Sequence, residues 1–167
     1  MQNNLPSSDI FKNLRTLKET EEFLSQINNT LESLFKIKRG SFSQVLDKNM
    51  GAENAQILKK IAEEKKIDLS NHSSLEKLLF EIKQEISKVK VLKLYLAIDP
   101  TPQIIENTSS WVKENLGEDV VLDIERDETI LGGAIISFDG QYKDFSLRKT
   151  LDEIFKSKRN EVFALIK

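Results

Sequence analysis

Apolar positions in the first 88 residues follow the spacing of amphipathic helices. From Asp9 onward they recur at intervals of three, four and seven residues, at Ile10, Leu14, Leu17, Leu24, Ile27, Leu31 and Leu34. Ser8 or Asp9 is a suitable N-cap, and the basic residues and glycine at 38–40 are typical of a helix end. Thr20, followed by two glutamates, is an alternative cap, so residues 9–38 form either one helix or two.

Three more helices are predicted before residue 89. They span residues 41–48, 52–66 and 74–88, and the two longer ones carry apolar residues on one side. Residues 68–73 separate the last two helices and are rich in turn and cap formers. No proline interrupts this region after Pro6, which favours long helices.

The pattern changes at Val89 from a helical period to a period of two. Residues 91–98 alternate so that one face is almost wholly apolar, which predicts a strand. The prolines within 99–102 end this strand. Residues 103–116 return to helical spacing, and Gly117 is a suitable end for that helix.

Three further strands are predicted after this helix. Residues 119–125 alternate apolar with charged side chains, and residues 134–138 form a second apolar run. The dipeptide Asp139-Gly140 is a two-residue hairpin signal, which predicts an antiparallel return strand through Tyr142.

The last predicted helix begins at Leu147, with Asp144 or Ser146 as its cap. One side of it carries the apolar residues Leu151, Ile154 and Phe155. Together these elements predict an α+β fold, in which a helical bundle precedes a small mixed α/β sheet with the order strand, helix, three strands, helix. The predicted domains are residues 1–88 and residues 89–167.

Composition narrows the function classes. The 167 residues carry 25 basic and 27 acidic side chains, a formal charge of −2, which disfavours broad binding to nucleic acid. There is no cysteine and a single histidine, so thiol chemistry and paired-histidine metal sites are excluded. Neither a membrane-spanning stretch nor a signal peptide is recognisable, so we expect a soluble intracellular protein.

Few residues are candidates for chemistry. His72 lies among turn formers, and we interpret it as a solvated loop histidine without a catalytic partner. Glu125, Asp127 and Glu128 lack the pattern of a calcium loop and are interpreted as a charged turn. The pair Gly132-Gly133 precedes a strand instead of a helix, which disfavours a phosphate loop. We therefore expect no catalytic residue, cofactor or metal, and an interaction protein.

Several motifs near the C-terminus occur together in one order. An acidic residue precedes a glycine pair that enters a strand, an Asp-Gly hairpin follows, and Asp-x-Ser with a basic residue begins the last helix. The positions are Asp127, Gly132, Gly133, Asp144, Ser146 and Arg148. This stretch resembles the C-terminal signature of the delta subunit of F-type ATP synthases, called the oligomycin-sensitivity-conferring protein in mitochondria. The resemblance extends over residues 78–155.

Physical chemistry gives these positions a structural role. The glycine pair permits close backbone approach, and Asp144 and Ser146 can accept hydrogen bonds from open backbone donors at the start of the last helix. Arg148 is in addition a candidate partner contact.

The resemblance implies a non-catalytic stator subunit in the peripheral stalk of an F-type ATP synthase, on the cytoplasmic side of a bacterial membrane. Its expected partners are the b subunit and the N-terminal helix of an alpha subunit, and contact with the membrane is only indirect. Candidate contacts with the b subunit are Leu151, Ile154, Phe155, Val162, Phe163 and Ile166. The alanine- and aromatic-rich opening of the family is not recognisable here.

Two alternatives stay open at the level of sequence. The E subunit of vacuolar and archaeal-type ATPases also has a glycine pair, a hairpin and a final helix, but usually begins with one long helix, which Gly40 and Gly51 disfavour here. A small regulatory or RNA-binding α/β domain would need a basic sheet face. From Val91 onward the chain carries 10 basic and 14 acidic residues, which disfavours that class.

Overall fold

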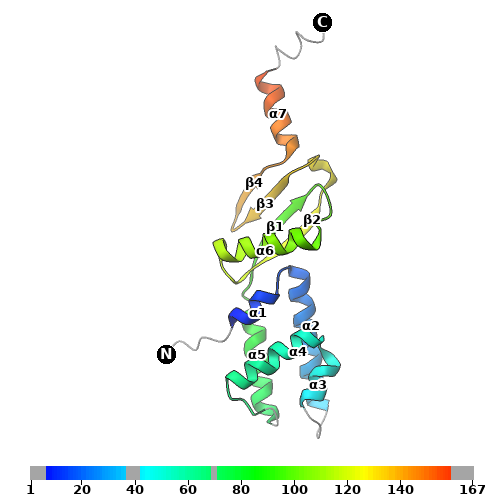
Figure 1. The fold of residues 1–167 in the computed structure, drawn as a ribbon, viewed down its shortest axis with the longest axis vertical. Helices are drawn as coiled ribbons and strands as arrows, with labels where there is room; N and C mark the ends of the chain where they lie inside the picture. The colour runs from blue at the N-terminus through cyan, green and yellow to red at the C-terminus, as the bar shows by residue number, and fades with distance from the viewer. Residues whose placement is uncertain (1–6, 37–41, 69–70, 159–167) are drawn as a thin grey trace.

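The front half of the molecule is a bundle of helices. A computed structural model describes residues 7–36, 42–68 and 71–158. Within these ranges the front half contains α1 (Ser7–Asn13), α2 (Leu17–Lys36), α3 (Phe42–Asn49), α4 (Ala52–Glu64) and α5 (His72–Ile86). Figure 1 shows this bundle at one end of an elongated molecule, with the sheet above it and the last helix at the far end.

Apolar side chains from the helices of the front half form one core. Leucine and isoleucine dominate it, and its largest fully buried side chains are Phe23, Ile27, Leu46, Leu58, Ile61, Leu75, Leu78, Leu79, Ile82 and Ile86. Burial of this apolar surface holds the helices together. The helical periodicity of the first 88 residues therefore reports the inward face of each helix.

The first helical segment is two helices, and the break lies before Thr16. The Thr16 hydroxyl accepts a hydrogen bond from the Glu19 backbone N–H (3.2 Å), and the Glu19 carboxylate accepts one from the Thr16 N–H (3.1 Å). This reciprocal pair is a capping box that starts α2. The suggested cap at Thr20 is wrong, because Thr20 is buried inside α2 and donates its hydroxyl proton to the Thr16 carbonyl. The suggested helix end at 38–40 lies outside the described residues.

The start of α5 also differs from the expectation. The Asn71 side chain accepts hydrogen bonds from the N–H groups of Ser73 and Ser74, so the helix begins at His72 instead of Ser74. His72 is therefore a half-buried residue of the first helical turn, and its interpretation as a loop histidine is wrong.

The back half is built on a four-stranded mixed sheet. Its elements are β1 (Lys90–Leu96), α6 (Pro102–Leu116), β2 (Val120–Arg126), the short 3-10 helix η1 (Glu128–Ile130), β3 (Ala134–Phe138), β4 (Gln141–Asp144) and α7 (Leu147–Ser157). The strand order is β2-β1-β3-β4, with β1 parallel to β2 and the other pairs antiparallel. The predicted α+β fold and element order are confirmed.

Helix α6 covers one face of the sheet. Val112 of α6 is buried against Leu92, Leu94 and Leu122. Helical spacing groups Trp111 with the apolar residues of this helix, but Trp111 is exposed on the outer side of α6. Ser109 of α6 is also buried, and it lies where this helix faces the end of α1 and the start of α2.

The face of the sheet opposite α6 packs against the helical bundle of the front half near the start of β1 and β2. Val121 of β2 is fully buried in the core of the helical bundle, and Val89 and Val91 pack against that core. The backbone N–H of Leu122 donates to the Arg15 carbonyl (2.9 Å), which extends the sheet edge onto the α1–α2 connection. The division into domains 1–88 and 89–167 stays a prediction.

Candidate functional site

The glycine pair lies where the chain enters β3 and passes close to the start of α7. Gly133 has φ +81°, and a Cβ atom there would overlap the Phe145 carbonyl oxygen and lie 3.2 Å from the Ser146 Cα. The Leu147 N–H donates to the Gly132 carbonyl (2.8 Å). Glycine is required at 133 because backbone lies where a side chain would be.

Asp144 and Ser146 organise the first turn of α7. The Asp144 carboxylate accepts a hydrogen bond from the Ser146 N–H (2.8 Å), and the Ser146 hydroxyl accepts one from the Lys149 N–H (3.2 Å). Ser146 is thus the N-cap of α7. Its side chain and backbone N–H stabilise the charged carboxylate, so the pKa of Asp144 lies below its ordinary value.

Asp127 plays a similar part at η1. Its carboxylate accepts hydrogen bonds from the hydroxyl (2.7 Å) and the N–H (2.9 Å) of Thr129, which lower the pKa of Asp127. The positive charge of Arg148 acts on both Asp127 and Asp144. These contacts give Asp127, Gly133, Asp144 and Ser146 local roles in shaping the backbone between η1 and α7.

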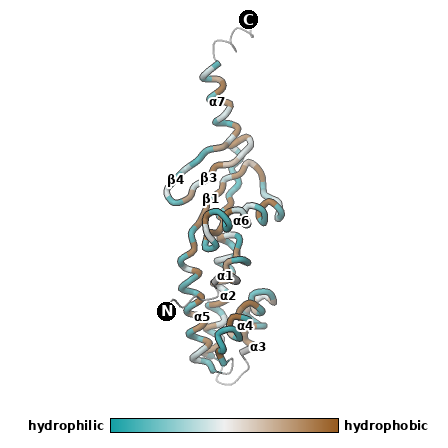
Figure 2. The backbone as a smooth tube through the Cα atoms, turned by 60° about the vertical axis from the view of Figure 1, so that its left-hand side comes forward, coloured by the Kyte–Doolittle hydropathy of each residue, from teal (hydrophilic) through white to brown (hydrophobic). Residues whose placement is uncertain are grey.

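Helix α7 carries an exposed apolar face. No residue of α7 is buried, Leu151 is half-buried, and Ile154 and Phe155 are 46% and 55% exposed. Figure 2 shows α7 standing away from the sheet with apolar and polar residues interspersed along it. The other candidate contacts, Val162, Phe163 and Ile166, lie outside the described residues. An amphipathic helix with an uncovered apolar face is typical of a partner-binding element.

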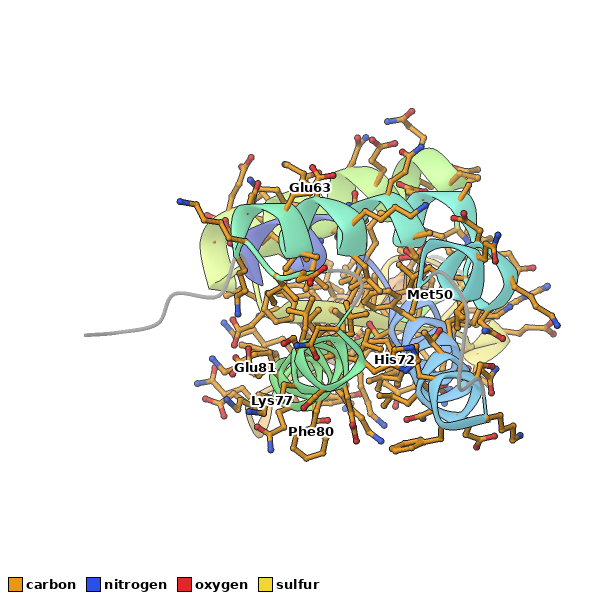
Figure 3. All side chains as sticks on the ribbon, turned by 90° about the horizontal axis from the view of Figure 1, so that it is seen from below. Met50, Glu63, His72, Lys77, Phe80 and Glu81 are labelled. Atoms are coloured by element: carbon orange, nitrogen blue, oxygen red, sulfur yellow. The ribbon has the colours of Figure 1, made fainter. Side chains whose placement is uncertain are left out.

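A second exposed apolar surface lies between α2 and α5. Phe35 is 71% exposed and Phe80 is 53% exposed, and both line a groove of about 610 Å³. Figure 3 shows Phe80 pointing from α5 away from the bundle. The complete lining is Leu31, Phe35, Ser73, Glu76, Lys77, Phe80, Glu81 and Lys83, so charges of both signs surround the aromatic pair.

The two halves are joined by polar contacts that the sequence did not predict. The half-buried Lys113 of α6 donates to the backbone carbonyls of Phe11 and Lys12 at the end of α1. Burial lowers the pKa of Lys113. Arg15 pairs with Glu19 (2.8 Å) beside this contact. The Thr-x-x-Glu spacing at 16–19 is a local signal for this joint, whereas nothing in the sequence pattern singles out Lys113.

The described residues offer neither a metal site nor a membrane span. Across residues 7–36, 42–68 and 71–158, no cluster of three or more histidine, aspartate or glutamate side chains is arranged to hold a metal ion. Over the same ranges no helix has the length and apolar character needed to cross a membrane. Among these residues, the exposed apolar surfaces of α7 and of the α2–α5 groove are the features typical of protein-binding sites.

Comparison with known proteins identifies the family. The family described as ATP synthase delta (OSCP) subunit matches residues 6–157, so the chain belongs to this family. It is similar to the ATP synthase subunit delta of Thermosipho africanus (strain TCF52B), with 27% identity over 172 residues that cover 92% of this chain and 88% of the relative. The ATP synthase subunit delta of Rickettsia massiliae (strain Mtu5) is 24% identical over 152 residues, covering 81% and 80%.

A third relative gives the highest identity of the three over a shorter stretch. The ATP synthase subunit delta of Rickettsia bellii (strain OSU 85-389) is 33% identical over 96 residues, covering 54% of this chain and 44% of the relative. The protein is accordingly a peripheral-stalk subunit of an F-type ATP synthase, and it belongs to a membrane-associated complex. The resemblance inferred from the C-terminal motifs is confirmed.

Proposed function

We propose that this subunit joins the b subunit to the alpha subunits at the top of the catalytic head, and so keeps the head from turning with the rotor. The observation that carries the proposal is the separation of the two exposed apolar surfaces. One lies on α7 and the other between α2 and α5, at opposite ends of the elongated molecule (Figure 1). A linker that transmits torque needs two such separated contacts.

The apolar face of α7 is the proposed binding surface for the C-terminal helix of the b subunit. Ile154 and Phe155 are both exposed, and Leu151 continues the face toward the sheet. A second amphipathic helix laid along this face would bury the three side chains. The opposite side of α7 is polar and carries Lys149 and Glu153, whose Nζ and Oε1 atoms lie 3.9 Å apart.

The groove between α2 and α5 is the proposed site for the N-terminal helix of an alpha subunit. Phe35 and Phe80 supply aromatic anchors of the kind that carry binding energy in helix-in-groove complexes. Lys83 of α5 donates to Asn28 of α2 (2.8 Å), which ties the two walls of the groove together. A groove with fixed walls loses little entropy when a helix binds.

The proposed role is mechanical and requires no catalysis by this chain. The protein would lie on the cytoplasmic side of a bacterial membrane and contact that membrane only through its complex. Tight contacts between preformed surfaces are sufficient for this task, and the position of the motif residues at backbone turns supports a structural role.

Binding measurements on the full-length chain test the two contacts separately. We expect truncation of Ile154 and Phe155 to alanine to weaken binding of a peptide from the C-terminal end of the b subunit at least about tenfold, since buried apolar anchors contribute more than about 1.4 kcal/mol. Truncation of Phe35 and Phe80 should weaken binding of a peptide from the N-terminal end of the alpha subunit similarly.

Each pair of substitutions should leave the other interaction unchanged. The control is Ile104→Ala, which removes an exposed apolar side chain of α6 that lies on neither surface. Equal binding of both peptides by all variants would contradict the proposal, as would loss of both interactions in one variant that keeps its helical circular dichroism.

A further inference from the structure

A polar cleft lies at the junction of the two halves, away from both proposed contacts. It forms where the end of α1, the start of α2 and the start of α4 face α6, and its volume is about 480 Å³. Figure 1 shows α1 and the start of α2 directly beneath α6. A volume of this size lies within the range of ligand sites, about 300–1,000 Å³. Its lining includes Arg15, Glu22, Glu53, Glu106, Ser109 and Lys113.

Three cations line the cleft, Lys12, Arg15 and Lys113, and each already has a partner. The Arg15 guanidinium donates to the Glu19 carboxylate (2.8 Å), and the backbone N–H of Arg15 donates to the same carboxylate (2.8 Å). Lys113 donates to two carbonyls at the end of α1. The last turn of a helix carries partial negative charge, so the Lys113 ammonium is balanced there.

Three carboxylates of the cleft have no such partner. The side chains of Glu22, Glu53 and Glu106 form no ion pair or hydrogen bond with the described part of the chain. Glu53 and Glu106 both line the cleft, and their charges act on Arg15 without forming an ion pair with it. The cleft therefore presents negative charge that the chain leaves unpaired.

A buried hydroxyl independently indicates a missing ligand. Ser109 lines the cleft and is 2% exposed, yet its Oγ has no hydrogen-bond partner among the described residues. Leaving a buried polar atom without a partner is unfavourable, so an unpartnered atom of this kind points to a group that completes the site. No other buried side-chain nitrogen or oxygen in the described residues is unpartnered in this way.

We propose that this cleft receives the guanidinium group of an arginine from a partner polypeptide. A guanidinium presents five donors in one plane, so it can reach carboxylates on opposite walls and also a hydroxyl. A single metal ion fits less well, because the acidic side chains of the described residues do not cluster around one point. An anion is disfavoured by the three unpaired carboxylates.

A bound arginine would account for both the unpaired carboxylates and the unpartnered Ser109 hydroxyl. Glu53 comes from α4 in the front half and Glu106 from α6 in the back half, so an arginine bound between them would bridge the halves. Such a contact would stiffen the joint of a stator. It goes beyond the two helix contacts proposed above and does not depend on either of them.

Titration of the isotope-labelled full-length chain with N-acetyl-arginine amide tests the proposal. We expect saturable amide shifts at Ser109 and Ser110, and at least tenfold weaker binding of N-acetyl-citrulline amide, which has a similar shape without the charge. The double substitution of Glu53 and Glu106 by glutamine should weaken arginine-amide binding at least tenfold. Both side chains are exposed, so the variant should keep its fold.

The matched control is Glu114→Gln, which removes an exposed carboxylate from α6 outside the cleft and should leave binding unchanged. Equal affinity for the arginine and citrulline probes would overturn the proposal. So would the absence of saturable shifts at Ser109 and Ser110, or equal binding by the double variant and wild type. None of these results would affect binding of the peptides from the b and alpha subunits, so the two proposals are tested separately.

Discussion

The substitution Gly133→Ala tests whether the close approach between the start of β3 and the start of α7 shapes the back half. Gly133 and Gly140 both have positive φ, +81° and +73°, so alanine is strained at either position. They differ in their surroundings, because a Cβ at Gly140 meets nothing within 4 Å, whereas at Gly133 it overlaps the Phe145 carbonyl oxygen. The pair therefore separates backbone strain from steric overlap.

The expected magnitudes follow from these two terms. A left-handed conformation costs an L-residue about 1–2 kcal/mol, which is the whole expected effect of Gly140→Ala. Gly133→Ala adds an overlap with backbone that no side-chain rotation relieves, and overpacking typically costs about 1–3 kcal/mol more. We expect Gly133→Ala to destabilise the protein by about 3–4 kcal/mol, roughly 2 kcal/mol beyond Gly140→Ala.

Urea unfolding measures both variants against wild type. Trp111, the single tryptophan, lies on α6 in the same half and reports its unfolding by fluorescence, while far-UV circular dichroism reports the helices. The melting temperature of Gly133→Ala should fall by about 6 °C or more, since 1 kcal/mol corresponds to about 2–4 °C for a protein of this size. Equal destabilisation by the two substitutions would refute the close approach as the reason for glycine at 133.

Three further substitutions test the cap and the joint between the halves. Ser146→Ala should cost about 1 kcal/mol in urea unfolding, because the Lys149 N–H loses its acceptor. Burial opposes ionisation of Glu19, but hydrogen bonds from Arg15 and Thr16 outweigh burial and hold the pKa of Glu19 below 4.5. The stability that the charged Glu19 contributes is therefore present above pH 4.5 and is lost as the pH falls through the lower pKa of the folded state. Glu19→Gln should reduce this loss of stability with falling pH. Burial holds the pKa of Lys113 below 10.5 in the folded protein. Just below pH 10.5 the unfolded chain therefore binds more protons than the folded protein, and the free energy of unfolding rises with pH. Lys113→Met should remove this rise.

Local sequence signals predicted the elements of the back half well. The bounds of β3, Ala134–Phe138, match the prediction, and Asp139 and Gly140 both have positive φ as a two-residue hairpin turn requires. These features depend on residues next to one another in the chain. The apolar face of α7 was likewise predictable, because the spacing of Leu151, Ile154 and Phe155 places them together on any helix.

Features that depend on packing between distant segments were not predictable. The groove between α2 and α5 brings Phe35 and Phe80 to one surface, and spacing within either helix does not indicate that both stay exposed. The contact of Lys113 with the end of α1 joins residues about a hundred positions apart. The exposure of Trp111 was not predictable for a related reason, since α6 carries apolar residues on both sides and the sheet decides which side is buried.

Purification of the full-length tagged chain from its native cell tests the account most directly. In the proposed role, in which it joins the b subunit to the catalytic head, it should bring down the alpha and b subunits of the F-type ATP synthase together. The variant with Ile154 and Phe155 changed to alanine should keep the alpha subunit and lose the b subunit in the absence of other stalk contacts. Recovery of a vacuolar-type G or H stalk subunit, or of neither alpha nor b with the unmodified chain, would contradict the account.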